Sequence, residues 1–322
     1  MDTSKQSRLA GGLSGCVAGV LVGWLGLAGA AAAQNAEPEP ADTGPAATSP
    51  GAPRPLVATE QSDMALSRLR PEAAVWLDLE SAGRALGLFY PEQEPPANGA
   101  VVLLADVGDN AASGVADELS RRLTAKGWAV LALGLPAPTP SLQRYLETPP
   151  SPAGSTSDDK DDDASAGDQS SVMIDVMAAS SGNAPDQGYR NRVRESLAAA
   201  TAALAERGYD QPALVGLGKA SNHLVALDEN LQGARALIWV APEFYERDAG
   251  ALAQQVAEGS TAILELYTSR GAARDDSQRR WADLRRAGVE RLERQPVAIS
   301  RPLAAHGAGA IAGRIDAWLK AL

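Results

Sequence analysis

The sequence is poor in the residues that form disulfides and metal sites. It has one cysteine, Cys16, and two histidines in 322 residues. A single cysteine excludes an internal disulfide and any cysteine-rich metal site. Aromatic residues make up only 4% of the chain, whereas hydrophobic residues make up 45%. The chain can therefore bury a sizeable core, and leucine, valine and alanine must form most of it.

Positively charged residues are also fewer than negatively charged ones, with 29 lysines and arginines against 40 aspartates and glutamates, so the net charge is −11 at pH 7. Nucleic-acid binders normally carry basic patches, so this balance argues against a nucleic-acid partner. An acidic run contains Asp159, Asp161 and Asp163, but a calcium loop would need a glycine at Ala164 and a glutamate at Ser170. We therefore predict no metal and no cofactor, and the partner stays open between a small molecule and a protein.

The first 33 residues have the pattern of a signal peptide. Lys5 and Arg8 form a short basic region, and an apolar stretch runs from Leu9 to Ala33. The triplet Ala31-Ala32-Ala33 matches an A-x-A cleavage site. This pattern predicts a protein that is exported to the periplasm or secreted.

Two alternatives would tie the chain to a membrane. The apolar stretch is long enough to span a bilayer if it is not cleaved. Leu13-Ser14-Gly15-Cys16 resembles a lipidation signal, although this cysteine precedes most of the apolar run. A membrane partner is expected only under one of these alternatives.

Composition also divides the rest of the chain. Residues 34–60 are rich in proline and alanine and are predicted to be a disordered linker. Residues 61–322 are predicted to form the folded domain. Within it, residues 137–187 break the pattern with prolines and an acidic run, which indicates a disordered insertion. Its one apolar island, Val172 to Met177, could pack over the domain.

Strand and helix patterns alternate through the domain. Continuous apolar runs typical of buried strands occur at 100–105, 128–133, 213–215, 236–240 and 262–267. Helical spacing separates them, and two further strand patterns, at 74–79 and 84–90, precede the first crossover. Such alternation predicts an α/β fold: a doubly wound, mostly parallel sheet with helices on both faces and an antiparallel N-terminal edge.

The turn after the run at 213–215 reads Gly216-Leu217-Gly218-Lys219-Ala220. A strand, a tight turn and a helix is the setting of the G-x-S-x-G serine nucleophile, and here a glycine stands where the serine would be. The pattern Gly216-x-Gly218-x-x-Ser221, with Glu243 after the next strand, is also close to a dinucleotide fingerprint. A third interpretation is a glycine turn without a site.

The order of elements from about residue 70 to the end resembles the α/β-hydrolase superfamily, in particular an uncharacterised proteobacterial branch of exported hydrolase-like proteins. The resemblance implies that Gly218 takes the nucleophile's place and that Gly216 is the first glycine of the turn. It also implies that Lys219 supplies one oxyanion-hole amide, and that the other comes from the segment beginning at Asp106. Two carboxylates in that segment, Asp106 and Asp109, are unfavourable for acyl transfer.

His306 follows the last predicted strand, where the resemblance implies the general base. No residue stands out as its acid partner. We therefore expect an exported α/β-hydrolase-like protein of unassigned function that lacks the serine nucleophile and acts in binding, near Asp106, Gly216 and Lys219. The alternative is a hydrolase of ester or peptide-like bonds that uses His306 or a carboxylate to activate water. A nucleotide-binding oxidoreductase is a further alternative.

Overall fold

The computed structural model describes residues 57–81, 83–150, 185–225, 234–269 and 271–322. All of them belong to one unit, Arg54–Leu322. The predicted signal peptide, Cys16, the acidic run and the apolar island Val172 to Met177 lie outside the described residues.

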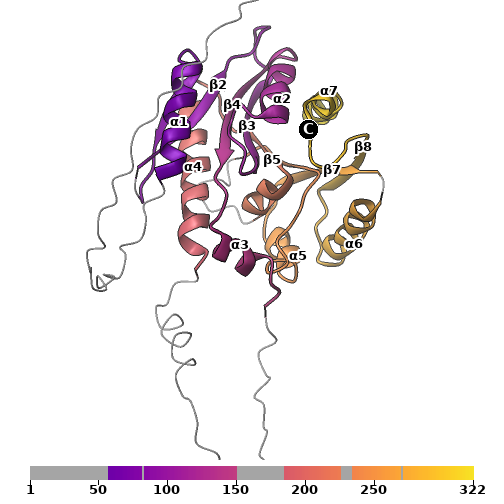
Figure 1. Cartoon of the computed structure of the whole chain (residues 1–322). Coiled ribbons are helices and arrows are strands. Elements are labelled where there is room, and N and C mark those ends of the chain that lie inside the picture. Colours follow the sequence, from indigo (N-terminus) through magenta and orange to yellow (C-terminus); the bar gives the residue numbers. More distant parts are fainter. Residues whose placement is uncertain (1–56, 82, 151–184, 226–233, 270) are drawn as a thin grey trace, which may run out of the picture. The chain divides into compact units, whose positions relative to one another are not determined.

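Eight strands form one sheet (Figure 1). They are β1 (Ala74–Asp78), β2 (Arg84–Tyr90), β3 (Gly99–Val107), β4 (Trp128–Leu135), β5 (Ala213–Leu217), β6 (Ala236–Val240), β7 (Ala262–Thr268) and β8 (Leu292–Val297). The strand order is β1-β2-β4-β3-β5-β6-β7-β8. β1 and β2 pair antiparallel, β2 pairs antiparallel with β4, and every other pair is parallel. The predicted mostly parallel sheet with an antiparallel N-terminal edge is confirmed.

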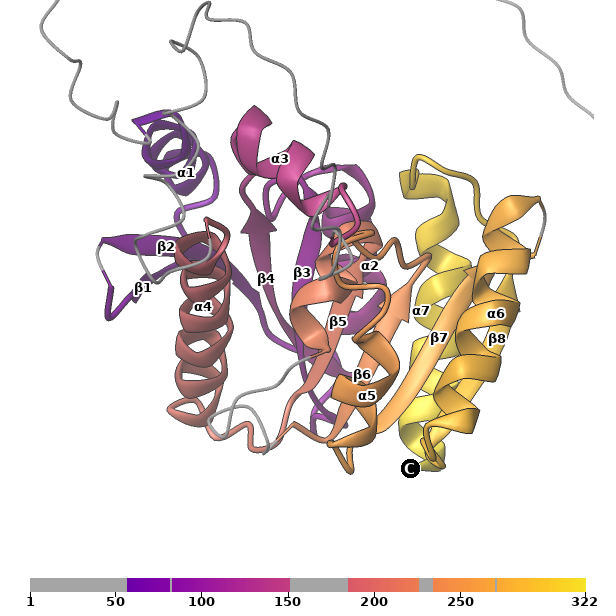
Figure 2. The ribbon, with the colours of Figure 1, turned by 90° about the horizontal axis from the view of Figure 1, so that it is seen from below.

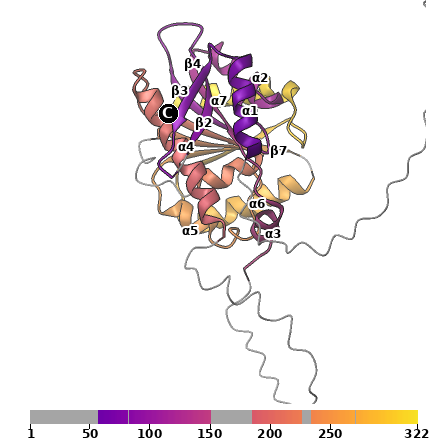
Figure 3. The ribbon, with the colours of Figure 1, turned by 60° about the vertical axis from the view of Figure 1, so that its left-hand side comes forward.

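Helices cover both faces of the sheet. They are α1 (Val57–Leu69), α2 (Gly114–Thr124), α3 (Pro140–Leu146), α4 (Gln187–Ala205), α5 (Leu252–Ala257), α6 (Ala272–Arg286) and α7 (Ala308–Ala321), with the 3₁₀ helices η1 (Gly218–Leu224) and η3 (Ala305–Gly307). Figure 2 shows α4, α5 and α6 on one side of the sheet and α2 and α7 on the other. α1 contacts β2 at the antiparallel edge (Figure 3).

The hydrophobic core lies in two layers, one on each face. Successive residues of a strand point to opposite faces, so a central strand needs apolar residues at every position. In β3, Val101, Leu103 and Ala105 join one layer, while Val102 and Leu104 join the other. All five are at most 1% exposed. This double burial explains why the central strands appear in the sequence as continuous apolar runs rather than alternating ones.

Three local features differ from the sequence-based expectation. α3 occupies part of the 137–187 segment that we predicted to be disordered, because Pro140 opens the helix, Thr139 caps it and Leu146 is fully buried. α1 begins inside the predicted linker and places Leu66 in the core. The turn after β5 continues into the 3₁₀ helix η1 instead of directly into an α-helix. Among the described residues, no helix has the length and apolarity needed to cross a membrane.

Candidate functional site

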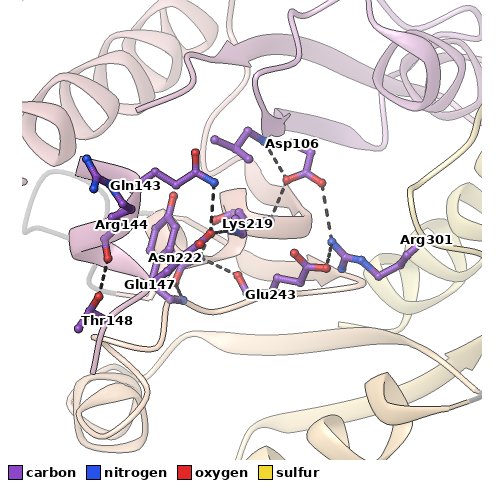
Figure 4. A network of polar contacts seen from close by, with 11 residues as sticks. Asp106, Gln143, Arg144, Glu147, Thr148, Lys219, Asn222, Glu243 and Arg301 are labelled. Atoms are coloured by element: carbon purple, nitrogen blue, oxygen red, sulfur yellow. Dashed lines mark hydrogen bonds and ion pairs between the residues drawn. The ribbon is translucent and has the colours of Figure 1, made fainter. Parts of the chain in front are cut away.

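The candidate site lies at the edge of the sheet where the parallel strands end. Asp106 is near the end of β3, Gly218 follows β5, Glu243 follows β6, and Arg301 lies in the loop after β8. Figure 4 shows Asp106, Glu243 and Arg301 pointing toward one another beside Lys219. In open α/β sheets this edge is where ligands bind, since the connecting loops converge there.

Strand register brings Asp106 to Gly218. β3 and β5 are parallel, and Leu104 pairs with Gly216. Asp106 and Gly218 each follow this pair by two residues, so they lie at the adjoining ends of the two strands. Gly218 has φ +54°, in the left-handed region that glycine adopts without penalty. A Cβ atom on Gly218 would lie no more than 2.5 Å from either carboxylate oxygen of Asp106. The Asp106 carboxylate thus occupies the space that a serine side chain at this turn would need.

The same carboxylate also binds two backbone amides. Asp106 Oδ1 accepts hydrogen bonds from the N–H of Val107, at 2.8 Å, and from the N–H of Lys219, at 2.9 Å. In serine hydrolases of this fold, the oxyanion hole consists of the amide after the nucleophile and a second amide from the loop after an early strand. In this chain the amide after Gly218 and the amide at the end of β3 are both bound to the Asp106 carboxylate.

Arg301 links three of these strand ends. Its Nη2 lies 2.5 Å from Glu243 Oε1 and 3.9 Å from Asp106 Oδ2. Its Nη1 donates a hydrogen bond to the carbonyl oxygen of Ala241, at the end of β6. The side chains of Arg301 and Asp106 are each 23% exposed, so solvent screens this pairing only partly. An arginine between two carboxylates holds together the loops after β3, β6 and β8.

A second group of contacts joins η1 to its neighbours. Lys219 Nζ pairs with the Glu147 carboxylate at the end of α3 and lies 5.6 Å above the Tyr245 ring. Asn222 Nδ2 donates to the carbonyl oxygens of Lys219, at 2.7 Å, and Glu243, at 2.8 Å. Asn222 Oδ1 accepts from the N–H of Tyr245 at 2.8 Å. These bonds fix the segment after Gly218 against the loop after β6.

The Lys219–Glu147 pair gives a prediction about pH. The hydrogen bond that Lys219 donates holds the pKa of Glu147 below its ordinary value. A carboxyl pKa that is lower in the folded state adds stability above the unfolded pKa, and this stability is lost as the pH falls through the folded pKa. In Lys219→Met we expect the pKa of Glu147 to rise to its ordinary range, measured by NMR titration of the side-chain carboxyl groups.

Glu195 supplies an internal control for that titration. Its pKa is also lowered, because Ser81 donates to it through both its side chain and its backbone, and Lys219 takes no part. The Glu195 titration should be unchanged in Lys219→Met. An unchanged Glu147 titration in the variant would show that the ion pair does not form in solution.

The structure places the other predicted site residues as follows. Gly216 is buried within β5, and a Cβ atom there would lie 2.9 Å from the Ser221 nitrogen. Ser221 is fully buried and donates to the Gly216 carbonyl oxygen at 3.3 Å. His306 is exposed in η3, and its imidazole makes no hydrogen bond or ion pair with any part of the chain that the structure describes. Asp106, Gly218 and Lys219 are thus brought together, whereas Arg301, rather than His306, reaches them from the loop after β8.

Sequence reasoning missed three residues of this site: Glu147, Asn222 and Arg301. Glu147 belongs to the segment that composition assigned to a disordered insertion. Arg301 shares a loop with His306, and only its position five residues nearer to β8 could have drawn attention to it. Asn222 follows the turn at Gly218 by four residues, and it stands between the polar residues Ser221 and His223, so nothing in the sequence singles it out.

A cavity of about 830 Å³ opens beside these contacts. Lys219, Glu243 and Arg301 form part of its wall, and most of the rest comes from the loop after β6 and from α5 and α6. Within the ranges that the structure covers, no three histidine, cysteine or acidic side chains are grouped so that they could hold a metal ion.

Comparison with known proteins places the chain in a family. Residues 18–297 match the family described as protein of unknown function (DUF3530). The chain belongs to this family. No curated protein matches the chain.

Solved structures similar to this DUF3530 chain are α/β-hydrolases. The structure of esterase Est22 with p-nitrophenol matches with a TM-score of 0.51 at 11% identity. The match covers 84% of this chain and 89% of the esterase chain. The Pyrococcus furiosus esterase Pf2001 matches with a TM-score of 0.50 at 11% identity. This match covers 77% of this chain and 91% of the esterase chain. At such low identity the likeness shows the α/β-hydrolase fold alone.

Proposed function

We propose that this DUF3530 chain is an exported α/β-hydrolase-like protein that binds a ligand and does not use a serine nucleophile. The observation that carries the proposal is the Asp106 carboxylate, which covers Gly218 and accepts from the amides of Val107 and Lys219. Export rests on the N-terminal pattern of the sequence, with Lys5, Arg8 and the Ala31-Ala32-Ala33 triplet.

Acyl transfer in this fold needs a nucleophile, an oxyanion hole and a base. Gly218 has no attacking atom, and the two amides already bind a carboxylate. A negative charge at this point would repel the charge that develops on the substrate oxygen. The base position is also unsupported, since His306 is exposed and Arg301 is the residue that reaches the site. An arginine stays protonated and cannot accept the proton.

The case for binding is the cavity next to the blocked centre, by which we mean Gly218 covered by the Asp106 carboxylate. Its volume of about 830 Å³ lies within the usual range for ligand sites of about 300–1,000 Å³. It lies at the carboxyl ends of β6 and β7, the edge of the sheet that carries sites in α/β folds. Phosphate binding at the turn itself is disfavoured, because the carboxylate leaves no room above Gly218 for a dinucleotide.

One observation favours the alternative in which a carboxylate activates water. Asp106 is held rigidly through Oδ1, while its side chain remains 23% exposed, so Oδ2 is a candidate base.

Hydrolysis of p-nitrophenyl acetate by the full chain separates these functions. The variants are Asp106→Asn, which keeps the shape of the side chain but removes its charge, together with Gly218→Ser and His306→Ala. We expect none of the four proteins to release p-nitrophenol faster than buffer. Gly218→Ser stays inactive because its side chain collides with Asp106 and no base is in place.

Hydrolysis of the ester by the wild type would instead identify the catalytic group through the variant that loses it. Turnover by the wild type that falls by about 10²-fold or more in Asp106→Asn would establish Asp106 as the base, in line with the usual contribution of acid–base groups. The same loss in His306→Ala would instead assign that role to His306. Either loss would overturn the non-catalytic function.

A further inference from the structure

The cavity beside the blocked centre has a lining of mixed charge. Five of its lining residues are acidic and four are basic: Glu147, Glu243, Glu246, Asp276 and Asp283, with Lys219, Arg279, Arg280 and Arg301. The remaining wall is apolar and comes mainly from α5, α6 and the loop after β6, and it includes Phe244, Leu252 and Leu284. The cavity therefore combines many hydrogen-bonding groups with a small apolar surface.

Each basic side chain of the lining is already neutralised by a carboxylate. The pairs are Lys219–Glu147, Arg301–Glu243, Arg279–Asp276 and Arg280–Glu265. Asp283 pairs with Arg286. Glu246 is the lining carboxylate for which the described chain offers no ion-pair partner. Since every cation of the lining has a carboxylate beside it, an anionic ligand would meet a negative charge next to each of them.

Behind the cavity wall lie buried polar groups that have no hydrogen-bond partner in the described protein. Within the described ranges, Arg280 Nε and Glu265 Oε2 are buried and have no hydrogen-bond partner, and the same holds for Trp239 Nε1. Trp239 and Glu265 are paired across β6 and β7, and Glu265 also contacts the Arg280 guanidinium. Two donors and one acceptor thus lie together behind the lining residues Arg280 and Phe244.

The aromatic ring of Phe244 connects these groups to the cavity. Trp239 packs against it edge-on at 5.2 Å, and the Arg280 guanidinium lies 5.0 Å above it. Phe244 is only partly buried and lines the cavity. The face of an aromatic ring is electron-rich, so it attracts the polarised C–H groups of a saturated ring.

We propose that this cavity binds a neutral, hydroxyl-rich ligand of the saccharide class. This inference rests on the proposed binding function and names its ligand. A hydroxyl group both donates and accepts, so it can satisfy carboxylates and guanidinium groups in one lining without separating their ion pairs. The apolar face of a sugar ring fits against Phe244, and the ring hydroxyls meet the paired charges around it. A ligand without hydrogen-bonding groups would displace water from the charged lining residues and replace none of their hydrogen bonds, which is unfavourable.

Titration of the full chain by NMR and calorimetry tests the inference. The neutral probes are glucose, maltotriose and di-N-acetylchitobiose, and glucuronate and glucosamine are their charged counterparts. We expect at least one neutral probe to bind saturably in the millimolar range or tighter, and at least 10-fold more tightly than glucuronate. Phe244→Ala should weaken that binding by about 10-fold, the effect of roughly 1.4 kcal/mol.

A second variant keeps the test informative if Phe244→Ala folds poorly. Glu246→Gln removes the charge of an exposed lining carboxylate, and we expect about 3- to 10-fold weaker binding, as for the loss of an ordinary hydrogen bond. Glu290→Gln, an exposed residue outside the cavity lining, is the matched control and should bind as the wild type does.

Each outcome is decisive for one of the two proposals. No saturable binding of any neutral probe, or tighter binding of glucuronate or glucosamine, overturns the saccharide inference and leaves the non-catalytic function standing. Equal binding by the wild type, Phe244→Ala and Glu246→Gln also overturns it, because the ligand then lies elsewhere. Cleavage of a bound probe, followed by release of a reducing sugar, would overturn the non-catalytic function while supporting saccharide recognition.

Discussion

Gly218→Ala should lower the free energy of unfolding by about 3 kcal/mol, the combined effect of left-handed backbone strain and overpacking. The backbone at Gly218 has φ +54°, and the added Cβ atom would collide with the Asp106 carboxylate. Urea denaturation followed by tryptophan fluorescence would measure the change. The collision can be relieved only if Asp106 moves, and that movement breaks its bonds to the amides of Val107 and Lys219.

The double variant Asp106→Ala/Gly218→Ala separates the collision from the backbone strain. Asp106→Ala alone removes two hydrogen bonds and should destabilise by about 1–3 kcal/mol. Together the two changes should destabilise by about 1–2 kcal/mol less than their sum, because the collision is then absent.

Gly313→Ala serves as the matched glycine control. Gly313 lies within α7, its φ is not positive, and no atom lies within 4 Å of a Cβ placed there. In a helix interior, alanine is more stable than glycine by roughly 0.5–1 kcal/mol, so this variant should gain stability. A Gly218→Ala protein as stable as the wild type would contradict the position assigned to Asp106.

Arg280→Met should be the second strongly destabilising change, with a loss of about 3–5 kcal/mol. Glu265 is fully buried in β7, and its closest basic partner is Arg280, whose Nη2 is 2.5 Å from Glu265 Oε1. Without Arg280, the carboxylate would keep only Arg294, at 3.8 Å. A buried charge that loses its partner is far more unfavourable than a pair that is removed as a whole.

A double variant again isolates the cause. Glu265→Gln/Arg280→Met removes both charges and should recover most of the stability that Arg280→Met loses, as measured by urea denaturation. The neighbouring Arg279 is 76% exposed and pairs with Asp276, so Arg279→Met should change stability by no more than about 0.5 kcal/mol. A similar loss in Arg279→Met and Arg280→Met would show that burial of the Glu265 pair is not the reason.

The sequence allowed the sheet to be predicted because its central strands are buried on both faces. Runs such as 100–105 and 236–240 can form little other than core strands, and the element order then suggested the superfamily. The helices α1 and α3 were not predicted. α1 has one buried leucine, Leu66, among the side chains described, and α3 is short and follows a proline-rich stretch. Neither helix has enough regularly spaced apolar residues for a helical periodicity to be recognised in the sequence.

The site could be predicted only in part, for a geometric reason. The glycine turn and the carboxylate at Asp106 were both visible in the sequence. Whether the Asp106 carboxylate lies over Gly218 depends on the register of β3 against β5. Residue patterns do not determine that register. The choice between His306 and Arg301 depends in the same way on the path of the loop after β8. The role of Glu147 required knowing that α3 ends beside Lys219.

The contact between Gly218 and Asp106 also limits how this protein could change over generations. A serine introduced first at Gly218 would meet the carboxylate and a strained backbone before any base is available. Removing Asp106 first would leave the amides of Val107 and Lys219 without their acceptor and take one of the two carboxylates from Arg301. Each single step lowers stability, and only the combination of the two avoids the collision. The identities of residues 106 and 218 are therefore coupled, so that a side chain at position 218 is accommodated only after the carboxylate at position 106 has changed.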